Sequence, residues 1–482
     1  MKLSELLNDI EVIMSMADLD MEISDISYDS RKTQPGNLFV AIKGFESDGH
    51  KFISAAREKG AAAVICETIP EGDLPYIVVE NSRLALALVS RNFFGNPAGE
   101  MKIIGVTGTN GKTTTTMLTK QVIEACTGKK LALIGTNHNM IGTEILETEH
   151  TTPESYELQK LFRHMADAGC DAVVMEVSSH ALALERVAGV RFSIAVFTNL
   201  TQDHLDFHHS MEEYAETKAR LFERCDMAVI NLDDCWGEFM CERAACPVFT
   251  YSESDLSADL IAKDIRLSPS DVRFVALVGQ SEIERVSLGI PGSFSVYNAM
   301  STIAAAHLFG ASLKEVSTAL KNAGGVKGRV EVVPTPEDYT ILIDYAHTPD
   351  ALENVLCSMN EVSTGRIVVV FGCGGDRDKS KRPIMGNIGT LYSDYAIITS
   401  DNPRTEDPAA IIADIVAGVK EPKSKYTVIE DRTKAIAYAI DSHHPGDVII
   451  LAGKGHETYQ IIGKEKQHMD ERETVAEHIA QK

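Results

Sequence analysis

Short apolar runs alternate with stretches of helical spacing along most of the chain. Each run is long enough for one buried strand, and the stretches between them are long enough for helices. This alternation is typical of largely parallel sheets covered by helices, so the sequence predicts an α/β fold. The clearest strand candidates are residues 172–177, 194–197, 227–230, 340–344, 366–371, 395–399 and 447–451.

Two turn-rich segments, NPAG at 96–99 and GGVKGR at 324–329, divide the chain into three blocks. We predict domains at residues 1–98, 99–328 and 329–482. The length of 482 residues agrees with three domains of about 150 residues each. Further expected elements are apolar runs at 38–42, 61–66 and 76–79, a strand-rich stretch at 247–292 and a helix at 297–308.

The chain is acidic, with 70 Asp and Glu residues against 46 Lys and Arg, for a formal net charge of -24. This balance argues against a general nucleic-acid-binding protein, which would normally show a basic face. Nine cysteines without C-x-x-C spacing argue against a zinc site or a disulfide framework. No apolar run approaches the length of a membrane span, and the N-terminus does not resemble a signal peptide. We expect a cytoplasmic protein.

The strongest chemical signal is GTNGKTT at 108–114, here called the phosphate loop, which lies between a strand candidate and a helical stretch. Backbone N–H groups of such a loop point at phosphates, and the following helix adds its N-terminal partial charge. Lys112 would reach the β- and γ-phosphates, and Thr113 could bind Mg²⁺. Val106 replaces the first glycine of the strict motif, so this is a variant loop. Its members are Gly108, Thr109, Asn110, Gly111, Lys112, Thr113 and Thr114.

Candidate metal ligands follow two of the predicted strands. Glu176 of MEVSSH and His204 of TNLTQDHLDFH both lie just past strand ends, where ligands of open α/β sheets gather. A carboxylate and an imidazole there suit a divalent cation that bridges phosphate oxygens. Without further context, Glu176 also fits a helix cap, Lys218 a solvent-facing helix lysine, and His208 and His209 surface positions.

Eight motifs occur in order over residues 108–460: GTNGKTT, EVSSH, TNLTQDHLDFH, YAETKARLF, DYAHTPD, GCGGDRDKSKRP, SDNPRTEDP and AGKGHETYQ. On these motifs the chain resembles the Mur ligases of peptidoglycan synthesis. The resemblance implies an N-terminal domain for the UDP end of the substrate, a central P-loop-type parallel-sheet domain for ATP, and a C-terminal Rossmann-like domain for the amino acid. It also implies an ATP-dependent ligase that adds a diamino acid to the D-Glu γ-carboxylate of UDP-MurNAc-L-Ala-D-Glu through an acyl phosphate. We expect a monomer with small-molecule substrates.

The resemblance implies roles for individual residues, with Lys112, Glu176, His204 and Lys218 as the catalytic candidates. Thr113 and Glu176 are expected to hold one Mg²⁺, and His204 a second. Lys218 is expected to be carbamylated (N6-carboxylysine) and to help place a metal ion. Asn298, Arg329 and Asp344 resemble contacts to adenine, phosphate and ribose. The residues that resemble contacts to UDP-MurNAc-dipeptide are Ser30, Thr151, Thr152, Ser178 and Arg186.

The choice of amino acid is argued from DNPR, which comprises Asp401, Asn402, Pro403 and Arg404. Alone, this segment predicts a turn before a helix. In the family that the chain resembles, it recognises the diamino acid. A guanidinium can hold the distal carboxylate of meso-diaminopimelate with two hydrogen bonds, whereas lysine would leave a buried Arg404 unpaired. We therefore expect meso-diaminopimelate, with further contacts from Arg377, Gly453 and Glu457.

Three other functions stay open. A lysine-adding ligase of the same family would require another role for Arg404. Folylpolyglutamate synthetase has a similar ATP domain, but DNPR, AGKGHE and the N-terminal block with DSR argue against it. A nucleotide switch without ligase activity is disfavoured by the presence of Lys112, Glu176, His204 and Lys218 together.

Overall fold

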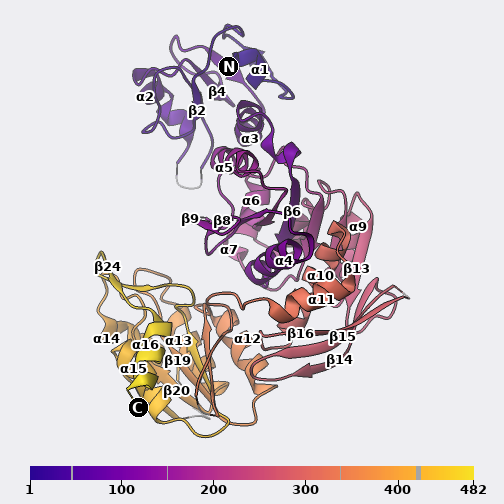
Figure 1. Ribbon diagram of the computed structural model, residues 1–482. Helices are drawn as coiled ribbons and strands as arrows, with labels where there is room; N and C mark the ends of the chain where they lie inside the picture. Colours follow the sequence, from indigo (N-terminus) through magenta and orange to yellow (C-terminus); the bar gives the residue numbers. More distant parts are fainter. Residues whose placement is uncertain (45–46, 149, 280, 337, 420–424, 482) are drawn as a thin grey trace. The chain divides into compact units, whose positions relative to one another are not determined.

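The computed structural model describes residues 1–44, 47–148, 150–279, 281–336, 338–419 and 425–481. The chain separates into two compact units, which Figure 1 shows coloured along the sequence. The first unit consists of Met1–Asp259 and Ala304–Ala311, and the second of Leu260–Ile303 and Ser312–Lys482.

The first unit begins with a five-stranded sheet and short helices. Its elements are α1 (Leu3–Leu6), β1 (Met14–Ser15), β2 (Asp25–Ser27), β3 (Asn37–Val40), η1 (Gly49–Phe52), α2 (Ile53–Glu58), β4 (Ala63–Cys66), β5 (Tyr76–Val78) and α3 (Ser82–Phe93). The strand order is β1-β5-β4-β3-β2, with parallel pairing except at the edge strand β1. Strands β3 and β4 are buried at every position, as expected for parallel strands covered on both faces.

The remainder of the first unit is a second, largely parallel sheet. Its elements are η2 (Pro97–Glu100), β6 (Lys102–Thr107), α4 (Lys112–Thr127), β7 (Leu131–Ile134), β8 (Asn139–Ile141), β9 (Glu144–Leu146), α5 (Ser155–Asp167), β10 (Ala172–Glu176), α6 (Ser179–Ala183), β11 (Ile194–Phe197), α7 (Leu205–His208), α8 (Met211–Ala219), β12 (Ala228–Asn231), α9 (Gly237–Arg243) and β13 (Val248–Ser252). The strands run in the order β13-β12-β11-β6-β10-β7-β8-β9. Strand β6 pairs in parallel with β10 and β11, so the ends of all three strands meet at one edge.

The second unit opens with an antiparallel ribbon of β14 (Leu260–Leu267), β15 (Val272–Val278) and β16 (Glu282–Leu288). Helix α10 (Phe294–Phe309) follows this ribbon, and its residues up to Ile303 belong to the second unit. Helix α11 (Leu313–Asn322) packs against β16. A capping box starts α11, because the Ser312 hydroxyl accepts from the Glu315 amide while the Glu315 carboxylate accepts from the Ser312 amide.

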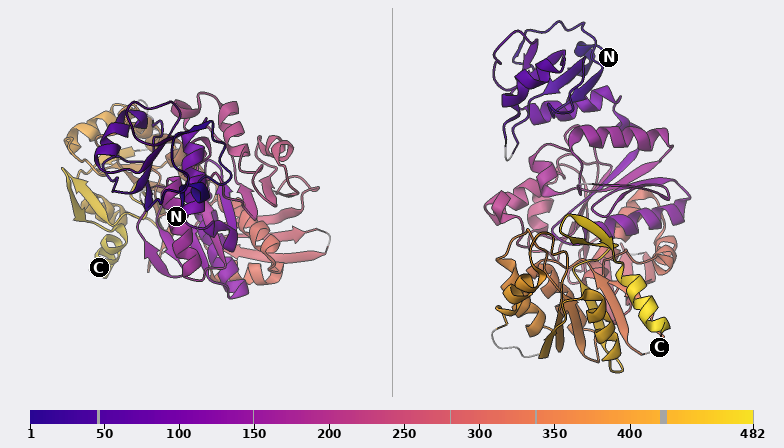
Figure 2. Two further views of the ribbon diagram at one scale, coloured as in Figure 1. Left: turned by 90° about the horizontal axis from the view of Figure 1, so that it is seen from above. Right: turned by 90° about the vertical axis from the view of Figure 1, so that its left-hand side faces the viewer.

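The C-terminal part of the second unit contains a six-stranded sheet and a hairpin. Its elements are β17 (Glu331–Val333), β18 (Thr340–Asp344), α12 (Pro349–Asn360), β19 (Ile367–Phe371), α13 (Lys381–Leu391), β20 (Tyr395–Ile398), α14 (Pro408–Val416), β21 (Lys425–Val428), α15 (Arg432–Asp441), β22 (Val448–Ala452), β23 (Tyr459–Ile462), β24 (Glu465–His468) and α16 (Glu471–Ala480). The strand order is β17-β18-β22-β19-β20-β21, and only β17 is antiparallel. Figure 2 shows the β23–β24 hairpin and α16 in yellow.

The structure confirms the predicted α/β class with parallel sheets, and it places strands in every apolar run that the sequence singled out. Element ends differ by a few residues: the helix expected at 297–308 spans Phe294–Phe309. The β23–β24 hairpin was not predicted, because its second strand is polar and exposed at every position. In the described parts of the chain, no helix combines the length and apolar character needed to cross a membrane.

Close packing between α13 and α14 yields a stability prediction. A Cβ added to Gly386 would lie 2.0 Å from the carbonyl oxygen of Ile415, so alanine must push the two helices apart. We expect Gly386→Ala to destabilise the protein by about 1–3 kcal/mol, as overpacked cores generally do. This clash outweighs the gain in helix propensity of about 1 kcal/mol.

Thermal unfolding followed by circular dichroism checks this prediction. Gly325→Ala is the matched control, because a Cβ there meets no atom within 4 Å. The control should keep or slightly raise the unfolding midpoint. Equal midpoints for both variants would contradict the packing argument.

Candidate active site

The phosphate loop joins β6 to α4 in a conformation that depends on two glycines. Gly108 has a φ of +152° and Gly111 a φ of +84°. A Cβ on Gly108 would lie 1.9 Å from Oγ1 of Thr198, so no larger residue fits there. The Lys112 ammonium donates to the carbonyl oxygens of Gly108 at 3.0 Å and Thr109 at 2.9 Å. Lys112 therefore places its charge at the loop, where a bound phosphate would need it.

The segment that follows β11 holds the phosphate loop in place. The Thr109 amide donates to the Asn199 carbonyl oxygen, and the Asn110 amide donates to Oδ1 of Asn199, both at 2.9 Å. The Thr198 hydroxyl donates to the Asn110 carbonyl oxygen at 2.7 Å. The Thr201 amide in turn donates to Oγ1 of Thr109 at 3.0 Å. The ends of two neighbouring strands thus share one hydrogen-bond network.

Lys218 lies in α8 with its side chain buried beside the phosphate loop, which excludes a solvent-facing role. Its Nζ donates to the Gly108 carbonyl oxygen at 2.8 Å, so this oxygen accepts from both Lys112 and Lys218. Burial lowers the pKa of Lys218 well below its usual range, and the neighbouring Lys112 charge lowers it further.

Glu176 ends β10 and is buried within a network of threonines. Its Oε1 accepts from the Thr136 amide at 2.8 Å, and its Oε2 accepts from the Thr136 hydroxyl at 3.0 Å. The same hydroxyl lies 3.1 Å from Oγ1 of Thr151. The Glu176 carbonyl oxygen accepts from the Thr152 hydroxyl at 2.8 Å. Glu176 is not a helix cap, because Ser178 caps the next helix, α6.

Ser178 and Arg186 extend the same network. The Ser178 amide donates to Oγ1 of Thr152 at 3.2 Å, and Arg186 donates to the Thr152 carbonyl oxygen at 3.1 Å. The structure therefore brings together Thr151, Thr152, Ser178 and Arg186, four of the five predicted dipeptide contacts. Ser30 lies in the turn after β2 and, in the described ranges, forms no hydrogen bond with these four.

Helix α5 connects the first sheet to this network. The Tyr156 hydroxyl donates to Asp25 and the Tyr28 hydroxyl to Glu157, both at 2.8 Å. Glu154, just before α5, pairs with Arg83 at 3.4 Å and with Arg186 at 3.3 Å. The segment with Ser30 is thus attached to the same helix as the predicted dipeptide contacts.

His204 precedes α7 in a left-handed conformation, with φ +52°. Its side chain is 46% exposed, and its Nε2 lies 3.4 Å from Asp203. His208, expected at the surface, is instead buried. Its ring stacks on Tyr214 and its Nε2 lies 2.9 Å from the Ser179 hydroxyl, because α7 packs against α8. His209 is exposed as expected.

The donor set fits a hard divalent cation only in part. The Thr113 hydroxyl and the Glu176 carboxylate are oxygen ligands of the kind that Mg²⁺ prefers. Across the residues that the structure describes, no group of three or more His, Cys, Asp or Glu side chains could hold a metal ion. Water, a bound nucleotide or a modified Lys218 could supply further oxygen ligands.

The second unit gathers its candidates at the carboxyl edge of the six-stranded sheet. Strand β18 ends at Asp344, whose carboxylate accepts from the amides of Val330 at 2.7 Å and Ala346 at 2.8 Å. Burial raises the pKa of Asp344. The Arg329 guanidinium lies over the Tyr345 ring, 5.1 Å from its centroid. Asn298, the predicted adenine contact, is buried in α10.

The DNPR segment follows β20 and is held by backbone contacts. Arg404 has a φ of +52°, a conformation that its side chain disfavours. The β23–β24 hairpin keeps it there, because the Arg404 amide donates to the Ile461 carbonyl oxygen and the Gly463 amide donates to that of Arg404. The Arg404 guanidinium donates to the Gly375 carbonyl oxygen at 2.8 Å.

The other predicted amino-acid contacts lie around this segment. Asn402 donates to Oε2 of Glu457 at 2.9 Å. A Cβ on Gly453 would lie 3.0 Å from Oδ2 of Asp401, and one on Gly375 would lie 1.9 Å from the carbonyl oxygen of Pro403. The loops after β22, β19 and β20 therefore press against one another. Arg377 differs from the rest, because it is exposed and donates only to the adjacent Asp376 carbonyl among the described residues.

Several residues of this site were missed by sequence reasoning. Thr136, which holds the Glu176 carboxylate, follows β7, and Thr198 and Asn199 follow β11. The rule that ligand-binding residues lie at strand carboxyl ends could have found all three. Arg382 gave no such signal: it is buried in α13 and pairs with Glu406 at 2.8 Å, which lowers the pKa of Glu406 to about 2.

Three family models match successive parts of the chain. They are described as Mur ligase family, catalytic domain (residues 22–93), Mur ligase middle domain (106–306) and Mur ligase, glutamate ligase domain (328–455). Together they reach from the first sheet to the loop after β22.

Curated relatives match over almost the whole chain. A UDP-N-acetylmuramoyl-L-alanyl-D-glutamate–2,6-diaminopimelate ligase from Caldanaerobacter subterraneus subsp. tengcongensis is 50% identical over 96% of each chain. A ligase of the same name from Clostridium botulinum is 47% identical over 95% of each chain.

Solved structures of ligases also align with this chain over most of its length. A 2,6-diaminopimelate ligase of that name aligns with a TM-score of 0.75 and 33% identity, covering 100% of this chain and 99% of the other. A folylpolyglutamate synthase from Mycobacterium tuberculosis aligns with a TM-score of 0.61 at 17% identity, over 77% of this chain and 92% of the other, which shows a shared fold alone.

Proposed function

The chain belongs to the Mur ligase family, and we propose that it joins meso-diaminopimelate to the D-Glu γ-carboxylate of UDP-MurNAc-L-Ala-D-Glu with ATP as the energy source. The whole-length identity to ligases named for 2,6-diaminopimelate carries this proposal. The reaction would contribute to peptidoglycan precursor synthesis. We also propose that the enzyme is a monomer and works in the cytoplasm.

The proposed reaction has two steps. A carboxylate oxygen of D-Glu attacks the γ-phosphorus of ATP, the bond to the β-γ bridging oxygen breaks, and an acyl phosphate and ADP result. The amine of diaminopimelate then attacks the acyl carbon, phosphate leaves, and the amine nitrogen loses a proton. Phosphoryl transfer depends mainly on positioning and charge neutralisation. The Lys112 ammonium at the phosphate loop would supply positive charge near the β- and γ-phosphates.

We propose that Thr113, Glu176, His204 and a carbamylated Lys218 hold Mg²⁺ when nucleotide is bound. The ion would neutralise charge on the phosphate oxygens. Carbamylation replaces an ammonium with an anion, and this change suits a lysine that is buried beside a second lysine. Of these four residues, Lys218 contacts the phosphate loop directly, through the Gly108 carbonyl oxygen.

The remaining site residues divide between the other two ligands. Asn298, Arg329 and Asp344 are proposed for adenine, phosphate and ribose. The connected Thr151, Thr152, Ser178 and Arg186, together with Ser30, are proposed for UDP-MurNAc-dipeptide. Their shared network through Thr152 supports a single binding surface near Glu176.

Arg404 supports diaminopimelate over lysine. Nη1 of its guanidinium donates to the Gly375 carbonyl oxygen. In the described part of the chain, its Nε and Nη2 have no hydrogen-bond acceptor. Two parallel N–H donors match a carboxylate, and only diaminopimelate carries a second one at its far end. A lysine substrate would leave these donors without an acceptor. Arg377, Asp401, Asn402, Pro403, Gly453 and Glu457 complete the proposed amino-acid site.

The proposed activity predicts phosphate release that requires all three substrates. With ATP, Mg²⁺ and UDP-MurNAc-L-Ala-D-Glu, we expect release with meso-diaminopimelate and a product heavier by that residue in mass spectrometry. L-Lysine and a reaction without amino acid serve as controls. Preference for lysine would keep the ligase and reject the Arg404 argument, and release that ignores both amino acids would support a nucleotide switch.

Lys218→Ala tests the carbamate. We expect turnover to fall by about 100-fold or more, because the variant loses an anion at the phosphate-transfer site. Added formate or acetate should restore part of the rate by supplying a carboxylate. Lys120→Ala is the matched control, since Lys120 is also a buried lysine of the first unit but pairs with Glu124. Normal activity of Lys218→Ala would reject the carbamate.

Arg404→Ala tests the recognition of the distal carboxylate. We expect kcat/KM for meso-diaminopimelate to fall by about 100-fold, because a charge-assisted, two-point contact is lost. The KM for ATP should change little and serves as the internal control. Arg404→Lys should recover only part of the loss, since an ammonium lacks the planar pair of donors. Equal losses for ATP and amino acid would argue against this contact.

A further inference from the structure

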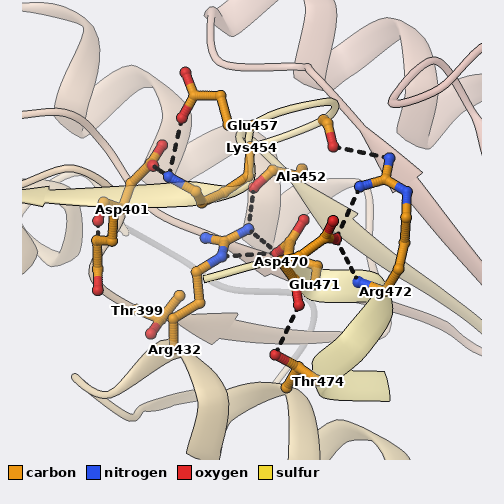
Figure 3. Close-up of polar contacts among 12 residues, drawn as sticks. Thr399, Asp401, Arg432, Ala452, Lys454, Glu457, Asp470, Glu471, Arg472 and Thr474 are labelled. Carbon is orange, nitrogen blue, oxygen red and sulfur yellow. Dashed lines mark hydrogen bonds and ion pairs between the residues drawn. The ribbon is translucent and has the colours of Figure 1, made fainter. Parts of the chain in front are cut away.

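Lys454 follows β22 with no exposed surface, in the middle of the proposed amino-acid site. Its Nζ donates to Oδ1 of Asn402 and to Oε2 of Glu457, each at 2.9 Å, and lies 3.5 Å from Oδ1 of Asp401. Figure 3 shows this ammonium between Asp401 and Glu457. The ammonium thus makes two hydrogen bonds and one longer ion pair, all within the proposed amino-acid site.

The contacts of Lys454 fix the orientation of two proposed binding residues. Both ends of the Asn402 side-chain amide form hydrogen bonds. Its oxygen accepts from Lys454 and from the Ile461 backbone amide, and its nitrogen donates to Oε2 of Glu457. Oε2 of Glu457 therefore accepts two hydrogen bonds, one from Asn402 and one from Lys454. Among the residues that the structure describes, its other oxygen, Oε1, has no hydrogen-bond partner.

Arg404 carries a positive charge, opposite to that of Glu457, and is bonded to the same β23–β24 hairpin as Asn402. Its backbone is held by the hairpin that also supplies the Ile461 amide to Asn402. Burial raises the pKa of Tyr459, the Glu457 carboxylate raises it further, and the Arg404 guanidinium lowers it. A cation and an anion with open hydrogen-bonding atoms suit a ligand end that carries both an ammonium and a carboxylate.

We infer that Lys454 is a positioning residue that turns Oε1 of Glu457 toward the distal amino group of the incoming diamino acid while Arg404 holds the distal carboxylate. This inference rests on the proposed function, since it takes the diamino acid as the ligand. Lys454 itself does not touch the substrate. Both of its hydrogen bonds and its ion pair with Asp401 go to proposed site residues, whereas an ion pair that served stability alone would not need to join them.

An ion pair at the opposite end of β22 shows what a purely structural pair looks like. Asp447 precedes the strand, is 1% exposed, and pairs with Arg366 at 2.6 Å. Arg366 also donates to the Ser442 carbonyl oxygen at 2.9 Å. Within the described residues, this pair touches none of the proposed site residues, so Arg366→Met is a matched control for Lys454→Met.

The test is steady-state kinetics of Lys454→Met in the full-length enzyme, with each of the three substrates varied in turn. Misplacing a binding carboxylate by about 1 Å can cost up to about 100-fold. We expect the KM for meso-diaminopimelate to rise about tenfold or more, and those for ATP and UDP-MurNAc-L-Ala-D-Glu to change less than about twofold. Equal increases in all three KM values would overturn the inference.

A double-mutant cycle with Glu457→Gln separates positioning from stability. If Lys454 acts through Glu457, Lys454→Met should raise the KM for meso-diaminopimelate by less than about twofold in the Glu457→Gln background. Full additivity of the two changes would overturn the inference. The double variant also removes one of the two carboxylates that Lys454→Met leaves without a cation, which favours folding.

Two further variants complete the design. Arg366→Met should lower the thermal midpoint but leave the KM for meso-diaminopimelate within about twofold of wild type. A comparable KM increase in this control would overturn the inference. Lys454→Gln keeps an N–H donor group without the charge and should give an intermediate KM. It replaces Lys454→Met if that variant does not fold, and a wild-type KM would contradict positioning. If wild type itself shows no diaminopimelate-dependent phosphate release, the proposed function fails instead.

Discussion

Parallel pairing of β6 with β10 and β11 is the constraint on which the candidate active site depends. The register places Glu176 opposite Val106 and Phe197 opposite Thr107, so the chain leaves all three strands at the same level. Hydrogen bonds from the segment after β11 then hold the phosphate loop, and the threonines after β7 hold Glu176. Lys218 reaches Gly108 from a helix that packs behind this edge. A shift of one strand by one residue would turn these side chains to the other face of the sheet.

In the second unit, candidate residues also lie at the carboxyl ends of parallel strands, but their side chains are of other kinds. There the ends of β18, β22, β19 and β20 gather carboxylates, an amide and a guanidinium in place of a glycine-rich loop. Glycines at 375 and 453 let these loops approach to distances that a side chain would prevent. In both units, the candidate residues at the sheets lie where parallel strands end.

Much of this arrangement could be predicted from the sequence, because it follows from local patterns. Buried apolar runs predicted the strands. The position of Glu176 at a strand end predicted that it lies at the carboxyl edge of the sheet. The sequence could not give Lys218 its burial or Arg404 its left-handed backbone, because both result from contacts with segments far along the chain. The polar β23–β24 hairpin lacks the apolar alternation that marks a strand, although it determines where Arg404 lies. The roles proposed for these residues come from the motif resemblance, and the structure shows which of them lie together.

The hairpin holds Arg404 through main-chain atoms only, with the amide of Arg404 bonded to the carbonyl of Ile461 and its carbonyl bonded to the amide of Gly463. The exposed side chains of Glu465–His468 take no part in these two bonds, so the backbone support of Arg404 does not depend on them. A segment of this kind can serve a site through the shape of its backbone, whatever side chains it carries there.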